Sequence, residues 1–141
     1  ICFGSQIVAH ALGGSVARAA RPEVGWHSVR SDRPADIDPG PWMQWHFDAF
    51  TTPPDFREVA RSDSGPQAIV GSRTFATQFH PEATETIVAR WSAGDPTDLA
   101  RLGLTAQSLM DDTRSNVGRS RRAAERLVDW YLNDVVGAPS A

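Results

Sequence analysis

The only cysteine of the chain stands directly before a short apolar segment with helical spacing. Cys2–Gly4 is followed by apolar side chains at helical intervals over residues 6–12, and the run ends at Gly13 and Gly14. This pattern predicts a short helix that starts immediately after the cysteine. A sharp strand-to-helix turn that keeps a reactive side chain exposed needs small neighbours, and Cys2–Gly4 fits the downstream half of such a turn. By itself the signal is modest, because a lone cysteine is more often an inert buried residue.

The rest of the chain divides into a strand-rich region and a helical region. Short β-branched and aromatic runs predict strands over residues 23–29, 43–50, 59–60, 67–71 and 74–79, and the last two could form a hairpin. Residues 31–41, rich in Pro, Asp and Gly, predict a loop. Beyond them, helices are expected from Pro81 to about Trp91, from Asp95 onward, and over about residues 119–135, where the apolar spacing is amphipathic.

A second chemical feature is the histidine predicted to end the last strand. His80 is followed by Pro81 and Glu82. A thiol at its ordinary pKa is mostly protonated at neutral pH, so a cysteine nucleophile needs a base, and the base needs a third group to hold its ring. His80 and Glu82 can supply both roles for Cys2. In isolation a His–Glu pair is more often a surface ion pair, but the two features together are much more specific.

Together these residues resemble the class I glutamine amidotransferase family. Its cysteine turn reads G-x-C-x-G-x-Q and its His and Glu lie in a Q-F-H-P-E segment, which residues 2–6 and 78–82 match; the likeness extends from Cys2 to about Trp91. The resemblance implies an α/β, flavodoxin-like three-layer domain with a mostly parallel sheet, whose N-terminal strands are missing from this chain. Residues 1–137 would be its C-terminal part, with a catalytic core over 1–92, C-terminal helices over 93–137 and a tail at 138–141.

The resemblance also implies an activity, the hydrolysis of the side-chain amide of L-glutamine. Cys2 would attack the amide and form a glutamyl thioester, His80 would act as base and then acid, Glu82 would orient the imidazole, and ammonia would pass to an acceptor, with a synthase as partner. Contacts to the substrate are implied for Phe3, Gln6, Trp45, His46 and Phe47. Many relatives carry a larger residue where this chain has Ser5, which leaves the subfamily and the acceptor open.

Composition excludes several other classes of function. The formal net charge of −3 gives no general attraction to nucleic acid or to an anionic membrane, and no apolar run is long enough to cross a bilayer. One cysteine excludes an intrachain disulfide framework and suits the cytoplasm. His27 and His46 lack a second ligand at zinc-site spacing, so neither a metal nor another cofactor is expected. Trp91 and Trp130 are expected to fill packing positions.

Two alternatives to the glutaminase hypothesis stay open at this point. One is a γ-glutamyl hydrolase of the same superfamily, and the other is a binding or regulatory module that keeps the fold without the chemistry. We also expect the chain on its own to expose apolar sheet surface and to be poorly soluble, because the sheet of an α/β core is covered on both faces.

Overall fold

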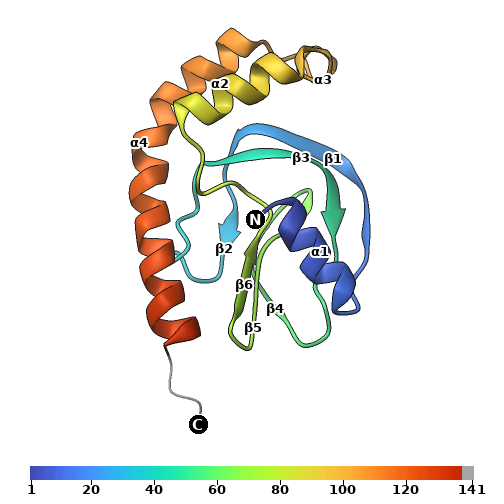
Figure 1. The fold of residues 1–141 in the computed structure, drawn as a ribbon, viewed down its shortest axis with the longest axis vertical. Helices are drawn as coiled ribbons and strands as arrows, with labels where there is room; N and C mark the ends of the chain where they lie inside the picture. Colours follow the sequence, from blue (N-terminus) through green and yellow to red (C-terminus); the bar gives the residue numbers. More distant parts are fainter. Residues whose placement is uncertain (138–141) are drawn as a thin grey trace.

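A computed structural model describes residues 1–137; the tail expected at 138–141 lies outside the described residues. The chain contains both helices and strands, as expected for an α/β protein: α1 precedes an uninterrupted run of strands, and the other helices follow it (Figure 1). The elements run in the order α1 (Phe3–Ala11), β1 (Val16–His27), β2 (Arg30–Ser31), β3 (Trp42–Phe50), β4 (Arg57–Ser62), β5 (Gly65–Gly71), β6 (Thr74–Thr77), α2 (Glu85–Gly94), α3 (Pro96–Arg101), α4 (Ala106–Trp130) and the π-helical η1 (Tyr131–Val136). The short helix after Cys2, the five expected strands and the hairpin of β5 and β6 are therefore confirmed, although β1 begins earlier, at Val16, and the short β2 was not expected.

The strands that pair within the described residues are antiparallel, whereas a mostly parallel sheet was expected. β1 pairs with β3, and β2, β4, β5 and β6 form a second sheet in that order. The physical reason is the connections. Parallel neighbours need a long crossover, usually helical, whereas short turns such as the one between β4 and β5 can join only antiparallel strands.

Helices cover both sides of the second sheet. Within β5, Ala68 packs in a cluster with Leu127 of α4, whereas its neighbour Ile69 packs in another cluster with Ala9 of α1. Successive side chains of a strand point to opposite faces, so α1 and α4 lie on opposite sides of β5. In Figure 1, α4 runs along one edge of the molecule and α1 lies beside the strands. This arrangement agrees with the expected three layers.

Of the helices after residue 81, α3 begins at Pro96 as expected, whereas α2 and α4 begin at positions other than those expected from the sequence. Pro81 and Glu82 lie in a turn, and α2 starts only at Glu85, because the Thr84 hydroxyl caps it by accepting from the Ile87 N–H at 3.2 Å. The helix expected from about residue 119 begins already at Ala106, where Thr105 and Ser108 form a reciprocal capping box. Its first turns are mostly polar at the surface, so apolar spacing did not reveal them.

The core fixes which side of the last strand faces the candidate site. Phe79 is fully buried and stacks on Trp42, with ring centroids 4.6 Å apart. Because side chains alternate along an extended chain, Gln78 and His80 point away from this stack. The backbone N–H of His80 donates to the Met43 carbonyl at 2.8 Å, which joins the end of this segment to β3 and connects the two sheets.

Among the described residues, no helix is both long enough and apolar enough to cross a bilayer. The large apolar side chains that stay exposed near the N-terminus lie on or beside α1, and include Phe3 and Ile7.

Candidate active site

The backbone at Cys2 makes a sharp, strained turn into α1. Cys2 has φ 49° and ψ −109°, a positive φ that non-glycine residues rarely adopt. Its N–H donates to the Thr77 carbonyl at 2.7 Å, and its carbonyl accepts from the Ser5 hydroxyl at 2.6 Å. Residues held in such conformations by their surroundings cluster at functional sites. The geometry agrees with the strand-to-helix turn expected around Cys2.

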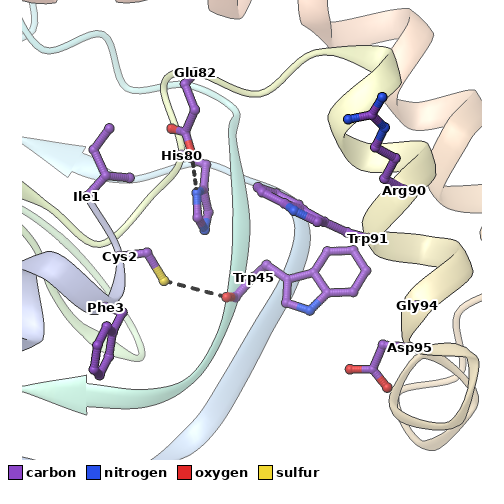
Figure 2. A pocket seen from close by; sticks show the side chains of 10 residues that line it. All are labelled: Ile1, Cys2, Phe3, Trp45, His80, Glu82, Arg90, Trp91, Gly94 and Asp95. Atoms are coloured by element: carbon purple, nitrogen blue, oxygen red, sulfur yellow. Dashed lines mark hydrogen bonds and ion pairs between the residues drawn. The ribbon is translucent and has the colours of Figure 1, made fainter.

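The structure brings His80 and Glu82 together and turns the imidazole toward the cysteine. The Nδ1–H of His80 donates to Glu82 Oε1 at 2.7 Å. The far end of the ring, which carries Nε2, points toward the Cys2 sulfur (Figure 2). The imidazole packs against Trp91 of α2 in a tilted arrangement, with ring centroids 4.7 Å apart and an interplanar angle of 59°. The sulfur itself lies 3.7 Å from the Trp45 carbonyl oxygen.

Cys2, His80 and Glu82 line a single cavity of about 570 Å³. A volume of this size suits a small-molecule ligand. Phe3 and Trp45 also line it, which places two of the expected substrate contacts at the site (Figure 2). The remaining lining residues are Ile1, Arg90, Trp91, Gly94 and Asp95, four of which belong to α2 or to the residue that follows it.

The surroundings of His80 favour its charged form. Burial alone would lower the pKa of His80, but its hydrogen bonds to Cys2 and Glu82, together with their charges, raise it to about 9. For Glu82, partial burial alone would raise the pKa of the carboxyl group, but the hydrogen bond and the charge of His80 bring it below the ordinary value. Both directions favour an imidazolium–carboxylate pair at neutral pH.

We expect this pairing to be measurable by NMR titration of the His80 ring. His80 should titrate near pH 9 in the unmodified protein, and Glu82→Gln should lower this pKa, because Glu82 is one of the two partners that raise it, the other being Cys2. The pKa is raised in the folded state, so the stabilisation from this pair is present in full below about pH 6.5 and is lost as the pH rises through about 9. His10, exposed on α1, provides an internal control whose signals should not respond to Glu82→Gln. A His80 titration that is identical with and without the Glu82 carboxylate would contradict the pairing.

Three expected substrate contacts lie outside the cavity lining. The side chain of Gln6 is 7% exposed, and its Nε2 donates to the Asp48 carbonyl at 3.3 Å and to Gln78 Oε1 at 3.2 Å. His46 is buried with its Nε2 3.1 Å from a Glu23 carboxylate oxygen. Phe47 faces Arg18, whose guanidinium carbon lies 6.0 Å from the ring centroid.

Two residues next to the candidate catalytic group, Trp91 and Gln78, do not follow from the sequence pattern. Trp91 was expected in a packing position, but it lines the cavity against His80 and also contacts Trp45, with ring centroids 5.7 Å apart. Because Trp91 lies on the helix that follows His80, its position in the sequence already indicates that it can lie near the site. Gln78, noticed only as part of a motif, donates from Nε2 to the Cys2 sulfur at 3.4 Å. Among residues 1–137, no group of three or more His, Cys, Asp or Glu side chains is arranged to hold a metal ion.

Comparison with known proteins decides the family. A family model described as glutamine amidotransferase class-I matches residues 1–89. The chain belongs to the class I glutamine amidotransferase family. It is also similar to proteins called glutamine-hydrolysing GMP synthases, with 37% identity over 97 residues for the one from Trichormus variabilis and 39% over 95 residues for the one from Thermus thermophilus. These matches cover 62% and 61% of this chain but only 18% and 19% of those synthases.

Solved structures support the fold of this family for the chain. A glutamine amidotransferase from Methylobacillus flagellatus matches with a TM-score of 0.83 and 22% identity, covering 95% of this chain and 61% of that one. Another from Thermotoga maritima matches with a TM-score of 0.77 and 26% identity, covering 97% of this chain and 61% of that one. The α/β class and the architecture of the family are thus confirmed. The chain spans about three fifths of the length of these two proteins and about a fifth of the synthases.

Proposed function

We propose that this protein hydrolyses the side-chain amide of L-glutamine through Cys2, His80 and Glu82. The single observation that carries the proposal is their arrangement at one cavity: His80 holds Glu82 through Nδ1 and turns its other end toward the sulfur. A protonated His80 beside the sulfur favours the thiolate, which is the nucleophilic form of cysteine. Membership of the class I amidotransferase family supports the same reading.

The proposed reaction proceeds in two halves. The Cys2 thiolate attacks the side-chain carbonyl carbon of glutamine, and the carbon–nitrogen bond breaks as His80 delivers its proton to the departing ammonia. A water molecule then gives a proton to His80 and attacks the thioester, which releases glutamate and restores the thiolate and the imidazolium. Glu82 holds the ring in place and stabilises its charge throughout. These steps use only protein groups and water, so we propose no cofactor and no metal.

The oxyanion formed in each half needs a hydrogen-bond donor near Cys2. Phe3 is the first residue of α1, and its N–H has no partner inside the helix. Within residues 1–137 no other hydrogen bond engages it. We propose that this N–H stabilises the oxyanion, as backbone donors at helix starts do for developing negative charge.

The other expected substrate contacts divide according to their positions. Trp45 lines the cavity and is proposed to contact the substrate directly. Gln6 and His46 do not line the cavity, so we propose that they support it indirectly, through their contacts with Gln78 and Glu23 respectively. Phe47 follows His46 on β3, and we propose that its backbone contacts the substrate.

The fate of the ammonia is inferred from the relatives. Because the similar proteins are called glutamine-hydrolysing GMP synthases, we propose a synthase as the partner that accepts the ammonia. The lone cysteine suits a reducing compartment, and on that ground we propose the cytoplasm as the location.

Substrate preference tests the proposed reaction. We expect the purified protein to release ammonia from free glutamine and to release little amino acid from a γ-glutamyl conjugate, measured by an enzyme-coupled ammonia assay and by chromatography of the amino-acid product. The reverse preference would favour a γ-glutamyl hydrolase. The absence of both activities, with and without a synthase partner, would favour a binding or regulatory module.

A further inference from the structure

We propose that Gln78 is a positioning residue for the nucleophile, and that Gln6 holds its amide in the orientation this requires. The proposal rests on the proposed function, because it concerns how the Cys2 sulfur is kept ready to attack. Gln78 is 1% exposed, lies outside the Cys2, His80 and Glu82 group, and places its Nε2 3.4 Å from the sulfur. An amide buried against a thiol needs a reason, because buried polar groups are costly unless they are paired.

The Asp48 carbonyl determines the orientation of the Gln78 amide, because Gln6 lies between them and contacts both. Gln6 faces the Asp48 carbonyl at 3.3 Å, and a carbonyl oxygen can only accept, so the Gln6 atom there must be its NH₂. The same NH₂ group lies 3.2 Å from Gln78, which must therefore present its oxygen to Gln6. The NH₂ group of Gln78 is then left to face the sulfur.

This orientation places a hydrogen-bond donor against the sulfur. A thiolate accepts from N–H groups and has no proton of its own, so a fixed amide donor stabilises it more than it stabilises the thiol. The Trp45 carbonyl at 3.7 Å has the opposite preference, because it can interact favourably only with the protonated thiol. Of these two neighbours Gln78 is the closer, so the pair together favours the thiolate.

The backbone makes the arrangement rigid. The Gln78 N–H donates to the Gln67 carbonyl on β5 at 2.8 Å, and the Cys2 N–H donates to the carbonyl of Thr77, the residue before Gln78, at 2.7 Å. The residues that carry the sulfur and the side-chain amide, Cys2 and Gln78, are therefore both held by backbone hydrogen bonds at the end of β6. A side chain held in this way loses little conformational entropy when it forms the bond.

The test is the pH dependence of Cys2 alkylation by iodoacetamide, measured together with kcat and KM for glutamine. Gln78→Leu removes the donor at similar volume, and we expect the midpoint of the alkylation profile to move up by roughly one pH unit, with a fall in kcat of about tenfold and little change in KM. Gln78→Glu should move the midpoint further, because a carboxylate repels the thiolate. Gln44→Leu is the matched control: Gln44 is also fully buried and donates to Gln67, not to the sulfur, so its profile should stay unchanged.

A second variant keeps the test decisive if Gln78→Leu does not fold. If circular dichroism shows that Gln78→Leu is unfolded, Gln6→Leu decides, because it leaves Gln78 in place but releases its amide; the midpoint should then move in the same direction by a smaller amount. Unchanged alkylation profiles and kcat in the folded Gln78 and Gln6 variants would overturn the inference. A protein that releases no ammonia but whose alkylation profile shifts as expected would instead contradict the proposed function and leave the inference standing.

Discussion

Replacing Cys2 with Ala is expected to abolish ammonia release from glutamine, with a loss of at least about a thousandfold in kcat. Without the sulfur no thioester can form, and the cavity retains only binding and the oxyanion donor, which by themselves give a small fraction of the rate of a complete catalytic group. Steady-state ammonia release measured over a range of glutamine concentrations checks the prediction. Affinity for glutamine should change much less than the rate, because the thiol is a small part of the cavity wall.

The control for Cys2→Ala is chemical labelling of the unmodified protein. An electrophilic glutamine analogue should modify Cys2, identified by peptide mass spectrometry, and glutamine should protect it. Because this is the only cysteine of the chain, no second thiol can account for the labelling. A Cys2→Ala variant that keeps the ammonia release of the unmodified protein would remove the sulfur from the mechanism and with it the proposed thioester.

Replacing His80 with Gln is expected to lower kcat by roughly a hundredfold to ten-thousandfold, the usual contribution of a positioned general acid and base. The ring supplies the proton for the departing ammonia and takes one from the water in the second half, and Gln can do neither. Glu82→Gln should lower the rate less, because the imidazole remains but is held and charged less firmly. In His80→Gln, the rate of ammonia release measured from pH 6 to pH 10 should lose the pH dependence that titration of His80 causes in the unmodified protein.

Two comparisons make the His80 prediction specific. His10→Gln, on the exposed side of α1, should leave the rate unchanged. The double variant Cys2→Ala with His80→Gln should be no slower than Cys2→Ala alone, since residues that act as one unit have non-additive effects. If the two losses multiply instead, the histidine acts independently of the cysteine, and the proposed pair is wrong.

Local sequence patterns predicted the elements that position the site better than the elements around it. The helix after Cys2 and the strand that leads to His80 follow from short-range spacing, so they could be read directly, whereas the helix expected from Pro81 begins only at Glu85. The start of α4 at Ala106 was missed because that part of the helix is largely solvated and carries little apolar periodicity. Apart from the β5–β6 hairpin, the antiparallel pairing was missed because strand direction depends on which strands become neighbours.

The sequence by itself determined the chemical groups and their local settings: a cysteine at the start of a helix, and a histidine two residues from a glutamate whose carboxylate can reach its ring. Only the tertiary structure decided that these groups share a cavity, that Trp91 forms its wall, and that the Gln78 amide turns its donor toward the sulfur. The physical reason is that these relations depend on hydrogen bonds between distant parts of the chain, such as Cys2 to Thr77 and His80 to Met43. Spacing along one chain does not encode which backbone groups meet across two sheets.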